Sequence, residues 1–197
     1  MSRDRFLGLL GMIGGLAGLA LVAVFAMTDF GMPGTAAYRT YEMLNRLIAL
    51  PLLLMACGWL GLALMLPFGY GRKGAWLAFV LAVAMAIGTA AEFWLFSDQP
   101  YGVWTNGRMI SFMTFFIPSL FFYLCATLVG VYQWRSGKGS RAVVIVLIAA
   151  IPLYIISVFT LNSNFLIPAV LAMAAGWLVW SFQRSRTVVG NMDSDMA

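Results

Sequence analysis

Apolar residues run in six long stretches along this 197-residue chain, and each stretch ends at charged residues, at glycine or proline, or at a polar turn. A helix of about 20 apolar residues crosses the roughly 30 Å hydrocarbon core of a bilayer. None of the stretches alternates with the period of two that a membrane-spanning strand shows. The pattern therefore predicts an all-α polytopic membrane protein, a bundle of six transmembrane helices at residues of about 6–28, 47–68, 75–96, 109–134, 142–161 and 165–182.

Both ends of the chain fit this organisation. Arg3 and Arg5 precede the first apolar stretch, as in a secretory signal peptide. The stretch is nevertheless about 22 residues long, against 7–15 for a signal core, which favours an uncleaved first helix. After Arg186 the sequence turns polar. We expect residues 1–186 to form one six-helix transmembrane domain and residues 187–197 to form a flexible cytoplasmic tail.

The distribution of basic residues predicts the orientation. The chain is 62% hydrophobic and 10% charged, whereas soluble domains are about 25% charged. With the N-terminus inside, the outer segments hold Arg39, Arg46 and Arg108, and the other nine basic residues fall inside: Arg3, Arg5, Arg72, Lys73, Arg135, Lys138, Arg141, Arg184 and Arg186. This bias places both termini in the cytoplasm. Lipid headgroups account for the excess positive charge, so no nucleic-acid partner is predicted.

Several kinds of chemistry are excluded or weakened by the composition. The chain has no histidine, which rules out His-ligated zinc or haem and the Ser-His-Asp and Cys-His catalytic units. Cys57 and Cys125 lie within predicted helices and form no CxxC motif, so we expect two small buried residues rather than a disulfide or a redox pair. We expect no metal and no cofactor, and the sequence argues against an enzyme.

Glycines at regular spacing mark one face of the first predicted helix. Gly11 with Gly15, and Gly14 with Gly18, form two overlapping GxxxG pairs. Small residues at this spacing let another helix backbone approach closely. The partner is either another helix of the same chain or the same helix of a second copy, in a homodimer.

Prolines occur inside four of the predicted helices, at Pro51, Pro118, Pro152 and Pro168. Each removes one backbone hydrogen bond and can bend its helix. Proline is common in transmembrane helices, so these positions give only weak support for a pocket or a moving part.

Glu92 is the only carboxylate within a predicted span, close to its outer end. Such a group usually faces the bundle interior or a partner. In the first outer loop, Thr35 follows a Gly-Met-Pro-Gly turn and is predicted to cap a helix that continues into the second span. Glu42 and Arg46 on this helix have the spacing of a favourable ion pair.

Polar groups within the spans gather in the predicted outer half, with Ser119 near the centre and Thr127 as the clearest exception. We therefore expect a polar vestibule at the outer face, in which two arginines beside one acid could hold an anionic headgroup or a carboxylate. The alternative is that these side chains are only solvated at the interface. The candidate binding residues are Glu92, Arg46, Arg108, Glu42, Asn45 and Ser111.

Three functional classes remain open. The first is a non-enzymatic binding or accessory membrane protein, acting through lipid or a membrane-protein partner, and the thin polar content favours it. The second is a small transporter or channel, which needs polar groups through both halves of the membrane. The third is a lipid-modifying enzyme, for which one intramembrane glutamate offers little acid–base chemistry. The pattern resembles many small six-helix bacterial membrane proteins, which suggests the bacterial cytoplasmic membrane.

Overall fold

The computed structural model describes residues 2–28, 35–96, 106–137, 139–161 and 165–195, with side chains as far as Phe182. This part of the chain is helical and contains no strand. Its elements are α1 (Arg3–Ala26), α2 (Ala36–Met65), α3 (Tyr70–Ala90), the π-helical turn η1 (Ala91–Leu95), α4 (Asn106–Ser136), α5 (Arg141–Ile148), α6 (Ala150–Leu161) and α7 (Leu166–Asp195). The backbone of α7 is helical as far as Asp195, past the point where a flexible tail is predicted.

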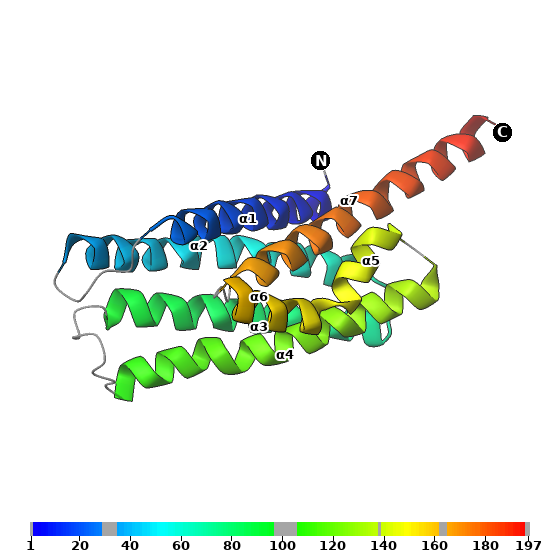
Figure 1. Ribbon diagram of the computed structural model, residues 1–197. Helices are drawn as coiled ribbons and strands as arrows, with labels where there is room; N and C mark the ends of the chain where they lie inside the picture. Colours follow the sequence, from blue (N-terminus) through cyan, green and yellow to red (C-terminus); the bar gives the residue numbers. More distant parts are fainter. Residues whose placement is uncertain (1, 29–34, 97–105, 138, 162–164, 196–197) are drawn as a thin grey trace.

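The helices lie side by side with their long axes roughly aligned (Figure 1). Neighbours along the chain pack together from α1 to α4, and α7 returns to lie against α1 and α2. The short helices α5 and α6 cover α4 and contact α7. The start of α1 and the end of α7 lie toward the same end of the bundle.

Four helices are long and apolar enough to cross a membrane: α1, α2, α4, and α3 continued through η1. A fifth crossing requires α5 and α6 together, and these are bent by 66° relative to each other. The described apolar part of α7, Leu166–Phe182, is shorter than a full span. The described part of the chain is thus helical, with several helices that could span a membrane.

The break between α5 and α6 interrupts what the sequence predicts as one helix over 142–161. Pro152 has no amide hydrogen, so the carbonyl of Ile148, four residues earlier, loses its helical partner. The hydroxyl of Thr127 in α4 donates to this carbonyl at 3.5 Å. Thr127, the exception to the predicted distribution of polar residues, therefore satisfies a backbone carbonyl that Pro152 leaves without a helical partner.

The glycine face of α1 packs within the chain. A Cβ on Gly11 would collide with the backbone of Gly58 in α2, and one on Gly14 would lie 2.6 Å from the amide nitrogen of Met55. A Cβ on Gly15 would lie 2.7 Å from the carbonyl oxygen of Ala169 in α7. Gly18 faces the side chains of the same two neighbours. These four glycines are accordingly covered by α2 and α7, the intrachain alternative.

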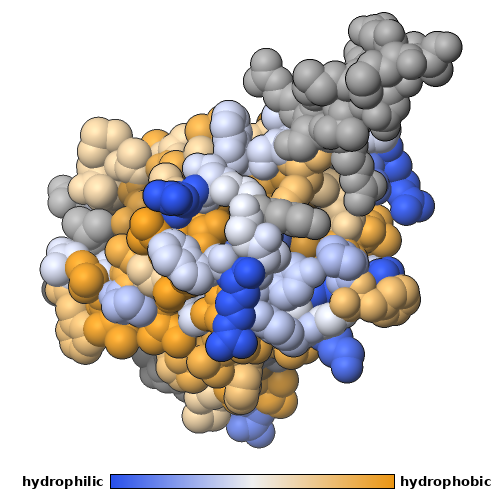
Figure 2. Space-filling view, turned by 90° about the vertical axis from the view of Figure 1, so that its right-hand side faces the viewer, coloured by the Kyte–Doolittle hydropathy of each residue, from blue (hydrophilic) through white to orange (hydrophobic). Residues whose placement is uncertain are grey.

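Charged side chains collect at the end of the bundle where the chain termini lie. Figure 2 looks onto this end and shows hydrophilic groups across it, with hydrophobic groups around them. Arg3 begins α1, Lys73 lies in the first turn of α3, Arg135 ends α4 and Arg141 begins α5, and all four are exposed. We call this the basic end, and the opposite end, where α2 and α4 begin, the far end.

Candidate functional site

Three elements bring polar side chains together at the far end. Thr35 caps α2 by accepting a hydrogen bond from the amide of Tyr38 at 3.2 Å, which confirms the predicted helix start. Both α2 and α4 contact η1, at the end of α3. We define the far-end cluster as Tyr38, Glu42, Asn45, Arg46, Glu92, Arg108 and Ser111. Six of these residues are the candidates from the sequence, and Tyr38 is added by the structure.

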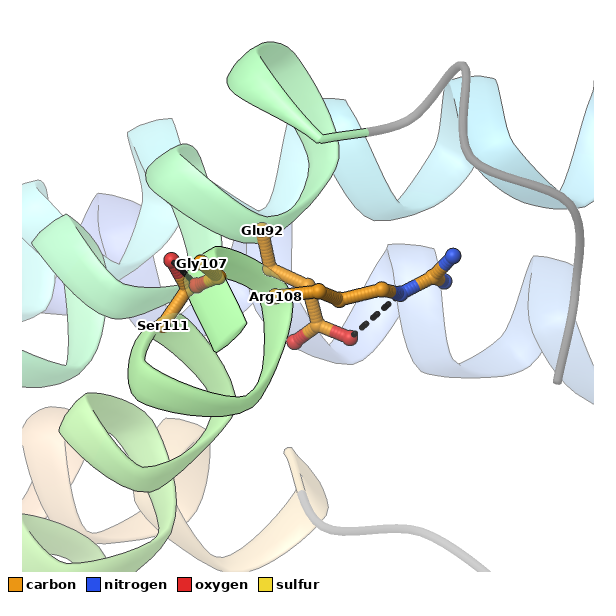
Figure 3. A network of polar contacts seen from close by, with 4 residues as sticks. All are labelled: Glu92, Gly107, Arg108 and Ser111. Atoms are coloured by element: carbon orange, nitrogen blue, oxygen red, sulfur yellow. Dashed lines mark hydrogen bonds and ion pairs between the residues drawn. The ribbon is translucent and has the colours of Figure 1, made fainter. Parts of the chain in front are cut away.

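Glu92 and Arg108 form the centre of the cluster (Figure 3). Arg108 Nε lies 3.7 Å from Glu92 Oε1, and the two side chains are only 8% and 11% exposed. The pair joins η1 to α4. A buried pair of this kind contributes little net stability because both charges lose their hydration, yet removing one partner leaves the other uncompensated.

The π-helical turn sets where Glu92 lies. A π-helix is wider than an α-helix and is frequent at functional sites. Here it ends the third span, so the carbonyl of Phe93 is left without a helical partner. Arg46 Nε donates to that carbonyl at 2.9 Å, and Trp94 Nε1 donates back to the Arg46 carbonyl at 3.3 Å. Arg46 thereby places a positive charge at the C-terminal end of a helix, where the helix dipole favours it.

Glu42 adds a second acid to the cluster. Tyr38 interacts with both Glu42 and Arg108 and so links α2 to α4. Glu42 Oε1 is buried and has no hydrogen-bond partner among the described residues. The Glu42–Arg46 ion pair predicted from their spacing is not formed, since the ion pairs within the described part of the chain are Arg3–Asp4 and Glu92–Arg108. Arg46 instead uses its Nε to hold η1.

The neutral members of the cluster bond to their own helices. Asn45 Nδ2 donates to the Tyr41 carbonyl at 2.9 Å, and Ser111 Oγ donates to the Gly107 carbonyl at 2.9 Å. Both side chains are buried rather than exposed to solvent. With two acids and two arginines, the cluster carries no formal net charge.

An apolar groove of about 510 Å³ lies on the half of α4 nearer the far end, lined by Met109, Ile110, Met113, Thr114, Ile117 and Pro118. At about 100° per residue, Met109, Ile110, Met113 and Ile117 lie about 100° or more around the helix from both Arg108 and Ser111. Most of the groove therefore lies on a face of α4 turned away from the far-end cluster.

Sequence reasoning missed buried polar atoms in the half of the bundle nearer the basic end. Trp59, Tyr123 and Gln133 are almost fully buried, and Trp59 Nε1, the Tyr123 hydroxyl and both amide atoms of Gln133 have no hydrogen-bond partner within the described residues. This half of the bundle is thus less apolar than the sequence predicts. The helical spacing of Ser111, Ser119 and Gln133 on one face of α4 is the signal that could have revealed it.

The described residues contain no group of three or more His, Cys, Asp or Glu side chains that could hold a metal ion. Cys57 and Cys125 are both free thiols. Comparisons with protein-family models, with curated proteins and with solved structures found no match.

Proposed function

We propose that the chain is a six-span protein of the bacterial cytoplasmic membrane, with both termini in the cytoplasm. The basic end of the bundle supports this orientation, because exposed arginines and lysines favour the cytoplasmic side. The bent α5–α6 pair then supplies the fifth crossing and α7 the sixth. The far-end cluster would face the outside.

Cysteine accessibility tests the orientation. Thr35 and Ser140 are exposed residues just before α2 and α5, at opposite ends of the bundle. In a background with Cys57 and Cys125 replaced by alanine, Thr35→Cys should react in intact cells with a membrane-impermeant maleimide. Ser140→Cys should react only after permeabilisation. The opposite pattern would place the basic end outside and refute the proposed orientation.

At the outer face, the protein's proposed role is non-enzymatic binding of a small polar ligand or lipid headgroup at the far-end cluster. The observation that carries this proposal is the buried Glu92–Arg108 pair, in which Glu92 lies on a π-helical turn. The second acid of the cluster, Glu42, has a buried oxygen without a hydrogen-bond partner among the described residues. Ionisable groups at membrane depth are expensive and generally mark functional sites. A bundle needed only as a scaffold has no use for four charged groups between its helices.

The arrangement favours a ligand with polar groups that can be recognised from two sides. Arginine guanidinium groups suit carboxylate or phosphate oxygens, and the Glu42 oxygen suits a hydrogen-bond donor. Because the cluster is already neutral, it can accept such a ligand without gathering net charge. Acid–base catalysis is less well supported, since Glu92 is held by Arg108.

Ligand retention tests the binding proposal. The full chain, extracted in a mild detergent, would be washed, and the small molecules and lipids that stay with it identified by mass spectrometry. We expect a specific ligand to remain on the wild-type protein and to be lost from Glu92→Gln and Arg108→Ala. Lys73→Ala removes a positive charge at the opposite end and should retain the ligand. Equal retention by Lys73→Ala and Arg108→Ala, or no specific ligand on the wild type, would refute the proposal.

A further inference from the structure

The interior face of α4 carries polar side chains along nearly its whole length. Arg108, Ser111, Ser119, Tyr123 and Gln133 are all buried. At about 100° per residue, all five fall within roughly one third of the helix circumference. The stripe extends over about 37 Å at 1.5 Å per residue, which is more than the roughly 30 Å thickness of the hydrocarbon core.

Near the middle of α4, two residues with polar atoms unpaired in the described part of the chain, Trp59 and Tyr123, contact the ring of Phe122. Its ring makes edge contacts with Trp59, at 5.4 Å between centroids, and with Tyr123, at 5.7 Å. Tyr123 also stacks on Tyr154 of α6 at 4.2 Å, and Tyr154 interacts with the hydroxyl of Ser119. Two aromatic donors, the indole N–H and the Tyr123 hydroxyl, therefore lie on one cluster of rings with no acceptor among the described residues.

Gln133 lies closer to the basic end, and two of its polar atoms lack a hydrogen-bond partner among the described residues. Its side chain is 1% exposed, and neither its amide oxygen nor its amide nitrogen is hydrogen-bonded within the described chain. Each unmatched polar group in a protein interior carries an uncompensated cost of lost hydration. Bulk water cannot relieve that cost inside a bilayer. Buried groups of this kind are commonly satisfied by ordered internal water.

We infer that the bundle interior binds ordered water at two places on the α4 stripe, one beside Trp59 and Tyr123 and one beside Gln133. Water is the ligand that fits, because it is the smallest molecule able both to accept from the indole and hydroxyl donors and to bridge the two amide atoms. Together with the far-end cluster, these two water sites would place polar groups along the bundle interior from one end to the other. That property suits the passage of protons or small polar solutes, and it goes beyond the proposed outer-face binding.

Hydroxyl-radical footprinting by X-ray radiolysis tests the inference on the wild-type protein in lipid nanodiscs. Radicals formed from a bound water modify adjacent side chains even when these are buried. Trp59 and Tyr123 should be modified several-fold faster than Met85, which is equally buried and intrinsically reactive. Exposed Trp94 is the positive control. Modification of Trp59 and Tyr123 at the same rate as Met85, whether that rate is slow or fast, would overturn the inference.

Two variants test the inference independently, because the unfolding temperature should change in opposite directions for hydrated and for dry groups. Tyr123→Phe removes only the hydroxyl, and Gln133→Leu replaces the amide by an apolar side chain of similar size. If water satisfies these groups, both variants should unfold at lower temperature and Tyr123→Phe should slow the modification of Trp59. If the groups are dry, both variants should unfold at higher temperature, which would contradict the inference. Neither readout depends on a ligand at the far-end cluster.

Discussion

Separating Glu92 from Arg108 should destabilise the bundle far more than separating an exposed pair at the same distance. At 3.7 Å the attraction between two unit charges is about 4.5 kcal/mol for an effective dielectric constant of 20. Removing one partner of a buried pair typically costs about 3–5 kcal/mol, because the remaining charge is left uncompensated. Arg108→Met should therefore be costly, while Glu92→Met/Arg108→Met should cost much less than the two single variants combined.

The chain offers a matched control in Arg3 and Asp4. Their charged atoms are 3.8 Å apart, but the side chains are 76% and 29% exposed, and exposed pairs contribute at most about 1 kcal/mol. Thermal unfolding in mild detergent, followed by tryptophan fluorescence, gives both double-mutant cycles. We expect a coupling of about 2 kcal/mol for the buried pair and a small fraction of that for Arg3–Asp4. Equal couplings would refute the view that burial makes Glu92–Arg108 special.

Two further predictions concern packing and the broken helix. Gly14→Ala should lower the unfolding temperature because its Cβ meets the Met55 backbone, at a cost of about 1–3 kcal/mol for overpacking, whereas Ala20→Leu on the exposed face of α1 should have little effect. Thr127→Val should lose about 1 kcal/mol by leaving a carbonyl unsatisfied, and Thr114→Val, whose hydroxyl bonds only within its own helix, should be nearly neutral. In both comparisons equal unfolding temperatures would contradict the structural reasoning.

The hydropathy pattern predicted the helical class and four of the helices because their apolar runs are long and uninterrupted. It also predicted the cap at Thr35, a local signal of residue type and spacing. The break at Ala149 could not be predicted with the same certainty. Pro152 occurs in that helix as Pro51 and Pro118 occur in α2 and α4, but α2 and α4 stay continuous. What differs is tertiary: Thr127 of another helix satisfies the orphaned carbonyl.

For the candidate site, residue type identified the charged members and the structure supplied the pairing. Glu92 stood out because a carboxylate in an apolar run is rare, and the structure pairs it with Arg108. The i,i+4 spacing predicted Glu42 as the partner of Arg46, which is wrong. Local spacing carries no information about η1, which is distant in sequence but provides the Phe93 carbonyl that Arg46 binds. Tyr38 was overlooked for the same reason, since its interaction with Arg108 joins residues far apart in sequence.

The glycine face of α1 also constrains the order in which the protein can mature. Gly15 packs on α7, which is synthesised after α2 to α6, while Gly14 packs on α2, which follows α1 directly. One side of α1 therefore stays uncovered until α7 has been synthesised. During that interval small-residue motifs could pair with foreign helices. A premature stop before Leu166 would leave the side of α1 that packs on α7 uncovered. Membrane quality control could detect that uncovered side.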